Sequence, residues 1–355
     1  MKTKAAFLVE FNKPIQIQEI ELEPLLEGEL IVRIMAAGIC GSDNHMFKGN
    51  DPRLKLPIVL GHEGVGIIEE IKSEKKDIFN KKLKKGDMVI WDRGITCNNC
   101  YYCLIKKEPW LCPNREVYGI TRNGCYSEYL TLDKKTKIIK IEEDIDPSIL
   151  VPSSCSGATS AHAVELCDIK LDSTVVIIGA GPLGVYCSKF ISQKGAKNII
   201  ALDTINNRLD LIKEFGANKI FDVNRTTFDE RKSYICKITG GRGADIIIDC
   251  SGNQSAIRDG IKLAAPGGSF LIPGVAIPLG NVPIELYEDI SKKNLRMQGV
   301  WVSSTNHFSE AVDITLRNKN LFKKIISYKI KLNDINEAFL NLDKNRNIMK
   351  GVIVS

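Results

Sequence analysis

The sequence predicts an α/β protein of two domains: a β-rich domain, then a domain with a doubly wound parallel sheet of six strands. Residues 1–156 contain short β-like runs that are broken by glycine and proline. Between residues 157 and 301, short apolar runs alternate with helical stretches. Strands that are apolar along their whole length, with helices between them, indicate a parallel sheet covered on both faces. A chain of 355 residues is long enough for about two such domains.

The first domain is expected to begin with a strand at Ala5–Val9. Further strands are predicted at Leu30–Met35, Val65–Ile71 and Met88–Ile90. The segment 302–355 is too short to fold alone, so we expect it to return to the first domain and complete it. Its pattern predicts helix, strand, helix and strand at Phe308–Asn318, Ile325–Ile330, Ile335–Leu342 and Gly351–Val354.

The second domain, residues 157–301, contains six predicted strands and the helices that connect them. The strands are Val175–Ile178, Ile199–Leu202, Lys219–Phe221, Ile246–Cys250, Ser269–Ile272 and Arg296–Val300. The helices are Pro182–Gly195, Asn206–Phe215, Thr227–Thr239 and Gln254–Leu263. Six strands in this alternation are what a doubly wound dinucleotide-binding fold requires.

The composition argues against several classes of protein. Hydrophobic residues make up 44% and charged residues 26%, which is ordinary for a globular protein. The net charge of +6 is spread over 49 basic and 43 acidic residues, and short clusters such as Lys81–Lys82 favour solvent-exposed faces over a nucleic-acid groove. No apolar run reaches the roughly 18 residues of a membrane span, and the start lacks a signal-peptide cleavage site. We therefore expect a cytoplasmic protein that binds neither nucleic acid nor membrane.

A glycine-rich turn marks the expected nucleotide site. Gly179, Gly181 and Gly184 form G-x-G-x-x-G between a buried strand and a helix that starts with Pro182 and Leu183. The first glycine permits the tight turn, the second allows the backbone to approach a pyrophosphate, and the third allows close packing of helix and strand. Phosphates are stabilised by backbone N–H groups at the helix N-terminus. A glycine turn without a nucleotide is the alternative.

Asp203 closes the next predicted strand, 19 positions after Gly184. A carboxylate at this place can accept hydrogen bonds from the adenosine ribose and repels a 2′-phosphate, which favours NAD over NADP. Arg208 lies five residues further on and is the counter-argument, because arginine can pair with that phosphate.

Eleven cysteines in a chain without an export signal indicate reduced thiols or metal sites instead of a disulfide framework. Four of them form one loop with the spacing C-x2-C-x2-C-x8-C: Cys97, Cys100, Cys103 and Cys112. Four sulfur ligands suit a closed, tetrahedral structural zinc. An iron–sulfur cluster is the second possibility.

A second constellation is dispersed along the chain. Cys40 opens the segment Cys-Gly-Ser-Asp-Asn-His, His62 lies in Gly-His-Glu-Gly, and Cys155 precedes the second domain. Singly, a histidine or cysteine of this kind is as well explained as a core residue. The chain has only four histidines, however, and two of them lie in these glycine-flanked polar loops ahead of a nucleotide fold. That combination favours a metal site.

Together these motifs resemble those of the zinc-dependent medium-chain alcohol and polyol dehydrogenases, over essentially the whole chain. The segments that carry the resemblance are Cys40–His45, Gly61–Gly66, the four-cysteine loop, Gly179–Gly184 and Gly241–Asp245. The resemblance implies a GroES-like catalytic domain, a Rossmann NAD-binding domain and two zinc ions per chain. The catalytic zinc would be bound by Cys40, His62 and Cys155, and the structural zinc by Cys97, Cys100, Cys103 and Cys112. Glu63 would lie behind the catalytic metal, and Asp43 would orient His62.

Two features depart from the family's pattern. Eight residues separate Cys103 from Cys112, where the family usually has seven, so we expect a bulge near Glu108–Pro109. Cys155 stands where many polyol and threonine dehydrogenases have a glutamate followed by proline, which favours the alcohol dehydrogenase branch.

The implied reaction is hydride transfer from an alkoxide held by zinc to NAD. The substrate would be a primary or secondary alcohol, with polyols and amino alcohols among the candidates. Ser42 would accept the alcohol proton, which then passes through the nicotinamide ribose to His45 and water. A loop cap for Ser42 and a surface position for His45 are the alternatives. The family usually forms homodimers or homotetramers.

Two other functions are weighed against this one. A non-catalytic NAD-binding zinc protein would be expected to lack Cys40, His62 or Cys155, and a zinc-free quinone or enone reductase would lack the ligand set. The substrate pocket is not defined by the sequence. Aromatic candidates for its lining, each equally explained as core, are Phe47, Trp110, Tyr118 and Trp301.

Overall fold

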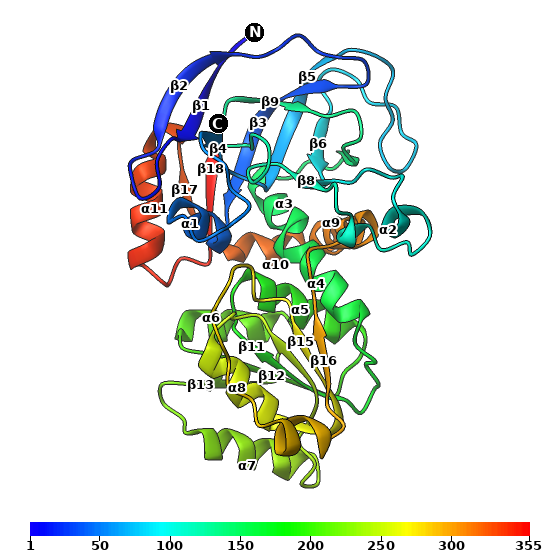
Figure 1. Ribbon diagram of the computed structural model, residues 1–355, viewed down its shortest axis with the longest axis vertical. Helices are drawn as coiled ribbons and strands as arrows, with labels where there is room; N and C mark the ends of the chain where they lie inside the picture. Colours follow the sequence, from blue (N-terminus) through cyan, green and yellow to red (C-terminus); the bar gives the residue numbers. More distant parts are fainter. The chain divides into compact units, whose positions relative to one another are not determined.

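The computed structural model describes residues 1–355, with the side chain of Asp343 left aside. The chain divides into two compact units. Unit 1 contains Met1–Ala158 and Ser303–Ser355, and unit 2 contains Thr159–Val302. Each unit is built around its own sheets, which Figure 1 shows in the colours of the sequence.

Unit 1 is organised around a seven-stranded sheet in the order β10-β6-β5-β3-β18-β17, with β9 also paired to β3. Its strands are β3 (Leu30–Ile39), β5 (Gly64–Ile71), β6 (Met88–Trp91), β9 (Tyr129–Leu132), β10 (Ile138–Ile141), β17 (Ile326–Ile330) and β18 (Lys350–Val354). Smaller sheets join β2 (Gln16–Glu21), β1 (Lys2–Leu8) and β4 (Ile58–Val59), and pair β7 (Gly94–Ile95) with β8 (Glu116–Val117). The long β3 is buried along most of its length, as its apolar sequence requires.

The C-terminal segment is part of unit 1. Strand β18 pairs antiparallel with the second half of β3, where Ile353 lies opposite Ala37. Figure 1 shows the red β18 beside the blue β3. This pairing brings Lys350, at the start of β18, to the end of β3 where Cys40 follows.

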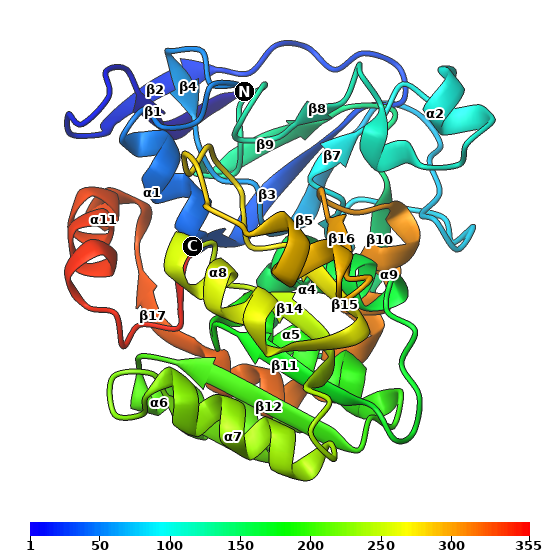
Figure 2. The same ribbon diagram turned by 60° about the horizontal axis from the view of Figure 1, so that its bottom comes forward.

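Unit 2 is a sheet of six parallel strands in the order β13-β12-β11-β14-β15-β16. The strands are β11 (Thr174–Ile178), β12 (Asn198–Asp203), β13 (Lys219–Asp222), β14 (Ala244–Asp249), β15 (Ala264–Ile272) and β16 (Arg296–Gly299). Figure 2 shows β11 and β12 side by side. This strand order is that of the doubly wound dinucleotide-binding fold, so the predicted fold class is confirmed.

The helices of unit 2 connect these strands. They are α5 (Pro182–Gln193), α6 (Asn206–Glu214), α7 (Phe228–Ile238) and α8 (Gln254–Leu263). Contacts join α5 to α6 and α7 to α8, as expected when one pair covers each face of the sheet. Local sequence sets the ends: Thr227 and Glu230 form a reciprocal capping box at the start of α7, with N–H···O distances of 3.2 and 2.6 Å.

The remaining helices lie outside the alternating strands and helices of unit 2. They are α1 (Gly41–Phe47), α2 (Tyr101–Leu104), α3 (Pro147–Leu150), α4 (Ser156–Glu165), α9 (Thr305–Arg317), α10 (Lys319–Phe322) and α11 (Ile335–Lys344). The prediction that His45 lies in a polar loop is wrong, because the segment folds into α1 with Asp43 and Met46 buried on it. Within the described part of the chain, no helix combines the length and apolarity that crossing a membrane would need.

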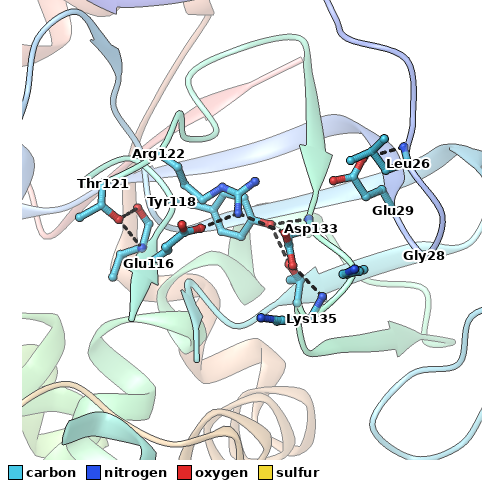
Figure 3. A network of polar contacts seen from close by, with 12 residues as sticks. Leu26, Gly28, Glu29, Glu116, Tyr118, Thr121, Arg122, Asp133 and Lys135 are labelled. Atoms are coloured by element: carbon cyan, nitrogen blue, oxygen red, sulfur yellow. Dashed lines mark hydrogen bonds and ion pairs between the residues drawn. The ribbon is translucent and has the colours of Figure 1, made fainter. Parts of the chain in front are cut away.

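Tyr118 anchors a polar network inside unit 1 (Figure 3). Its ring is fully buried, and its hydroxyl lies 2.7 Å from Thr136 Oγ1 and accepts the Asp133 N–H at 2.8 Å. Arg122 lies over the ring at 5.0 Å and pairs with Glu116 at 2.9 Å. Tyr118 is therefore a core residue, which decides between the two roles that its sequence position allowed.

Candidate active site

Three separate segments of unit 1 bring four potential metal ligands together. Cys40 follows β3 and caps the start of α1, His62 and Glu63 precede β5, and Cys155 lies immediately before α4. One ligand atom from each of the four lies within 4.8 Å of all the others. The backbone joins two of these segments directly, because Gly38 N–H donates to Glu63 C=O at 2.8 Å. The dispersed residues of the sequence thus form one cluster.

Gly61 places His62 in this cluster. Its φ of +93° lies in the left-handed region, and a Cβ there would come within 2.5 Å of the Tyr126 ring. A residue with a side chain would be both strained and in collision with a buried aromatic ring. The glycine before His62 is therefore needed for the chain to turn the imidazole toward the cysteines.

Asp43 fixes the orientation of His62. The two side chains are almost completely buried, and Asp43 Oδ1 lies 3.3 Å from His62 Nδ1. Asp43 Oδ2 accepts the Cys40 N–H at 2.7 Å and the Tyr126 hydroxyl at 2.8 Å. Burial lowers the pKa of His62, but Asp43 and the Cys40 thiol outweigh it and raise that pKa to about 10. With Nδ1 facing Asp43, Nε2 is the nitrogen left to bind a metal.

Glu63 is paired with Lys350, which sequence reasoning missed. The Lys350 ammonium lies 2.8 Å from Glu63 Oε1 and 2.6 Å from Oε2, and both side chains are buried. Burial raises the pKa of Glu63, against the opposing effect of Lys350. The only sequence signal was a lysine at the start of an otherwise apolar final strand. Because both groups are buried, removing either partner would leave an uncompensated charge in the interior.

Arg93 is a second residue that the sequence did not point to. It lies two residues after β6, is 7% exposed, and its Nη1 contacts Cys155 Sγ. Burial alone would lower the pKa of the Arg93 guanidinium, but the charge effects of the nearby Cys155 and Cys40 sulfurs and of Asp92 outweigh it and raise that pKa. The cluster is therefore flanked by two buried cations, Arg93 and Lys350.

The donor set fits a zinc ion. Two sulfurs and an imidazole are ligands of the soft-to-borderline kind that zinc prefers, and three protein ligands are typical of catalytic zinc sites. Contact with Cys155 lowers the pKa of Cys40 well below its usual value, against the effect of burial. A thiolate is the ionisation state that binds metal. We infer that Cys40, His62 and Cys155 would hold the ion, with Glu63 beside it.

The four-cysteine loop forms a second cluster in unit 1. The sulfurs of Cys97, Cys100, Cys103 and Cys112 lie within 4.8 Å of one another. The Sγ–Sγ distance is 4.0 Å from Cys97 to Cys103 and 3.5 Å from Cys97 to Cys112. A tetrahedral zinc with Zn–S bonds of about 2.3 Å requires roughly 3.8 Å between sulfurs. The two distances are close to this value, so the cluster fits a zinc ion.

The backbone is irregular near Glu108–Pro109, where the longer cysteine spacing predicts a bulge. Lys107 has a φ of +57°, and Pro109–Leu111 forms a single 3₁₀ turn. Leu111 N–H donates to Glu108 C=O, which closes that turn.

Trp110, one of the aromatic candidates for the substrate pocket, lies against the ring of His307, with 5.7 Å between the ring centroids.

Unit 2 contains the predicted dinucleotide turn. Gly179 has a φ of +96°, Gly181 is the N-cap of α5, and Pro182 and Leu183 begin that helix. A Cβ at Gly184 would collide with the Gly179 carbonyl oxygen, so helix and turn approach as closely as this motif requires. Free N–H groups at the N-terminus of α5 form the kind of site that binds phosphate.

Asp203 is built into this turn. Its Oδ2 accepts the Ala180 N–H at 2.6 Å, and its Oδ1 accepts the N–H groups of Thr204 and Ile205 at 2.7 and 2.9 Å. Arg208 Nη1 lies 3.8 Å from where a Cβ on Gly181 would be. Both predicted nucleotide-binding side chains therefore lie at the glycine-rich turn.

Ser42 and His45 lie three positions apart on α1, and therefore on neighbouring turns of the same helix face. Both are half-buried. Burial lowers the pKa of His45, and Lys48 lowers it further.

Of the remaining aromatic candidates, Phe47 packs on Phe339 with 5.3 Å between ring centroids, and Trp301 is 42% exposed.

Comparison with known proteins agrees with both units. Residues 26–143 match the family model of the alcohol dehydrogenase GroES-like domain, and residues 182–317 match that of the zinc-binding dehydrogenases. An alcohol dehydrogenase of Geobacillus stearothermophilus is 30% identical over 97% of this chain and 96% of its own length. The chain belongs to the zinc-dependent medium-chain dehydrogenases.

Solved and curated relatives extend this assignment. The crystal structure of an alcohol dehydrogenase from Thermotoga maritima matches with a TM-score of 0.95 and 41% identity, over 100% of this chain and 99% of that one. The 5-exo-hydroxycamphor dehydrogenase of Pseudomonas putida is 29% identical over 99% of this chain and 98% of its own length. As a member of this family, the chain is an oxidoreductase that acts on the CH–OH group of small alcohols.

Proposed function

We propose that the protein is an NAD-dependent zinc dehydrogenase of a primary or secondary alcohol, with polyols and amino alcohols within the range. The observation that carries the proposal is the convergence of Cys40, His62 and Cys155 on one point, with His62 oriented by Asp43. The glycine-rich turn of unit 2 supplies a site for NAD, which accepts the hydride. Unit 1 is then the catalytic domain and unit 2 the NAD-binding domain.

The catalytic zinc would be held by Cys40, His62 and Cys155, and when bound it supplies a Lewis acid that makes an alcohol easier to deprotonate. Asp43 holds the imidazole in the tautomer that offers Nε2. Glu63, neutralised by Lys350, keeps a carboxylate close to the ion without adding net charge to the site.

Ser42 and His45 would move the proton. Ser42 follows Cys40 by two positions, so its hydroxyl is available to accept the proton of the alcohol oxygen. His45, half-buried one helical turn later, has a lowered pKa because of its burial and is therefore a neutral imidazole near pH 7. A neutral ring can take up a proton and release it to water.

Asp203 supports NAD as the coenzyme. Its three backbone hydrogen bonds hold a carboxylate at the edge of the turn, and a fixed negative charge there disfavours a 2′-phosphate. Arg208 is close enough to the turn to contribute to phosphate binding. We assign Arg208 to the pyrophosphate, because the negative charge of Asp203 at the same turn disfavours a 2′-phosphate there.

The four-cysteine loop would hold a structural zinc. All four ligands are sulfur, so no coordination position is left for substrate. We further propose that the chain assembles as a homodimer or homotetramer, as is usual in the family.

The test is an NADH-absorbance assay with a panel of alcohols, polyols, amino alcohols and hydroxy acids. Each substrate is offered with NAD and with NADP, before and after treatment with a zinc chelator. Chelator-sensitive reduction of NAD supports the proposal and names the substrate group. Faster turnover with NADP would overturn the role given to Asp203, and chelator-insensitive turnover would overturn the role of zinc.

A further inference from the structure

Two backbone hydrogen bonds fix the chain at Arg93. Strand β6 ends at Trp91, and the next residue, Asp92, donates its N–H to Lys137 C=O at 2.9 Å. The Arg93 carbonyl accepts the N–H of the buried Tyr118 at 3.1 Å. With its backbone fixed in this way, the side chain reaches the Cys155 sulfur, with which Nη1 is in contact.

The Cys155 sulfur is one partner of the buried Arg93 guanidinium. The neighbouring carboxylate, Asp92, accepts the Gly94 N–H at 2.9 Å and lies 3.9 Å from a different guanidinium, that of Arg115. Burying an arginine is costly unless an anion compensates its charge. The groups near it that can carry negative charge are the sulfurs of Cys155 and Cys40, which are thiolates when they bind a metal, and the carboxylates of Asp92 and Glu63.

We propose that Arg93 is a positioning residue for the catalytic zinc site, which donates a hydrogen bond to the Cys155 sulfur and so weakens its donation of charge to the ion. The inference rests on the proposed function. Zinc with two thiolates has no net charge, and Lys350 balances Glu63. The buried Asp43 carboxylate beside His62 is a remaining negative group. The Arg93 guanidinium offsets this charge, which favours the development of negative charge on the alcohol oxygen during its deprotonation.

A hydrogen bond to a metal-bound thiolate has a spectroscopic signature. It lowers the energy of the sulfur lone pairs, so the sulfur-to-metal charge-transfer band moves to shorter wavelength. Zinc has no such band because its d shell is filled. Cobalt(II) in its place provides one, and the contribution of the four-cysteine loop can be subtracted with a Cys40→Ser variant.

The experiment compares Arg93→Met, Arg93→Lys and the unmodified protein, all loaded with cobalt(II). Arg231→Met is the matched control, because Arg231 is an equally buried arginine, 4% exposed, that donates to Thr226 C=O in unit 2. The readouts are the charge-transfer band, the rate at which a chelator removes the catalytic metal, and kcat and KM with zinc.

We expect Arg93→Met to shift the band to longer wavelength, to change the rate of metal removal, and to lower kcat by roughly 10–100-fold with a smaller effect on KM. Arg93→Lys should recover part of each of these three effects, since it keeps a donor and the charge. Arg231→Met should change none of the three. If a folded Arg93→Met variant has an unchanged charge-transfer band and an unchanged kcat, the inference about Arg93 is overturned and the proposed function is not. Failure of the unmodified protein to bind metal or reduce NAD would overturn the proposed function as well.

Discussion

Asp43 joins two of the proposed zinc ligands through one carboxylate. Its Oδ1 lies 3.3 Å from His62 Nδ1, and its Oδ2 accepts the backbone N–H of Cys40 at 2.7 Å. The tautomer of the imidazole and the position of the cysteine are thus set by the same buried group. Tyr126 completes the arrangement by donating its hydroxyl to Oδ2 at 2.8 Å.

Asp43→Asn is predicted to weaken zinc binding at the catalytic site by roughly 10–100-fold, because the amide cannot stabilise Nδ1–H as a carboxylate does. Competition with a chromophoric chelator measures the affinity. Tyr126→Phe is the matched control: it removes one hydrogen bond to the same carboxylate and leaves the charge, so it should have a much smaller effect. Equal effects of the two variants would contradict the role given to the Asp43 charge.

The ion pair between Glu63 and Lys350 is predicted to show strong coupling. Lys350→Met leaves a buried carboxylate without its cation, and we expect a loss of about 3–5 kcal/mol in the free energy of unfolding. The double variant Glu63→Gln with Lys350→Met removes both charges and should be more stable than Lys350→Met alone. Urea unfolding at pH 7 of the unmodified protein, of the single variants Lys350→Met and Glu63→Gln and of the double variant gives the four free energies of unfolding. Simple additivity of the two single losses would refute the coupling.

Tyr118 is predicted to limit stability at alkaline pH. Burial raises the pKa of its hydroxyl to about 12, above the value of 10 expected in the unfolded chain. The folded state therefore keeps its proton longer than the unfolded state. The stability that this provides is fully present below pH 10 and is lost as the pH rises from 10 to 12, by roughly 2–3 kcal/mol.

Tyr118→Phe tests this pH dependence. The variant should be less stable at pH 8 by about 1–3 kcal/mol, because the Asp133 N–H and Thr136 hydroxyl lose their partner. The alkaline loss of stability between pH 10 and 12 should be correspondingly shallower than in the unmodified protein. Thermal unfolding of both proteins between pH 10 and 12 measures this loss. If the stability of the two proteins falls in parallel over this range, Tyr118 is excluded as the titrating group.

The coenzyme preference is predicted to depend on the charge of Asp203. Asp203→Asn keeps one acceptor oxygen for the backbone N–H groups and removes the negative charge. We expect the ratio of kcat/KM for NAD to that for NADP to fall about tenfold or more, equivalent to roughly 1.4 kcal/mol. Adding Arg208→Gln should then weaken both coenzymes and leave this ratio unchanged, because Arg208 is assigned to the pyrophosphate that they share. A ratio that Asp203→Asn leaves unchanged would show that another group selects the coenzyme.

Sequence alone predicts the parts of the molecule whose residues lie close together along the chain. The turn from Gly179 to Gly184 and the four-cysteine loop each lie within one short stretch, so their spacing carries the geometry. The parallel strands of unit 2 were likewise visible as short apolar runs, and their order follows from the fold class. Element ends differed by a few residues, as for β15, which begins at Ala264 instead of Ser269.

The parts that sequence does not show are contacts made only by tertiary folding. Lys350 reaches Glu63 because β18 pairs with β3, and Arg93 reaches Cys155 from the end of a different strand. Neither pairing has a spacing that could be read along the chain. Helix α1 was also missed, because its short polar segment lacks the apolar periodicity that signals a helix.

Metal content measured together with activity tests the central claim most directly. The unmodified protein should contain about two zinc ions per chain, Cys155→Ser about one with no NADH formation, and Cys112→Ser about one with reduced thermal stability and residual activity. The two variants separate the catalytic from the structural site. Iron instead of zinc in the four-cysteine loop would contradict its assignment, and a Cys155→Ser variant that still reduces NAD at an undiminished rate would contradict the account as a whole.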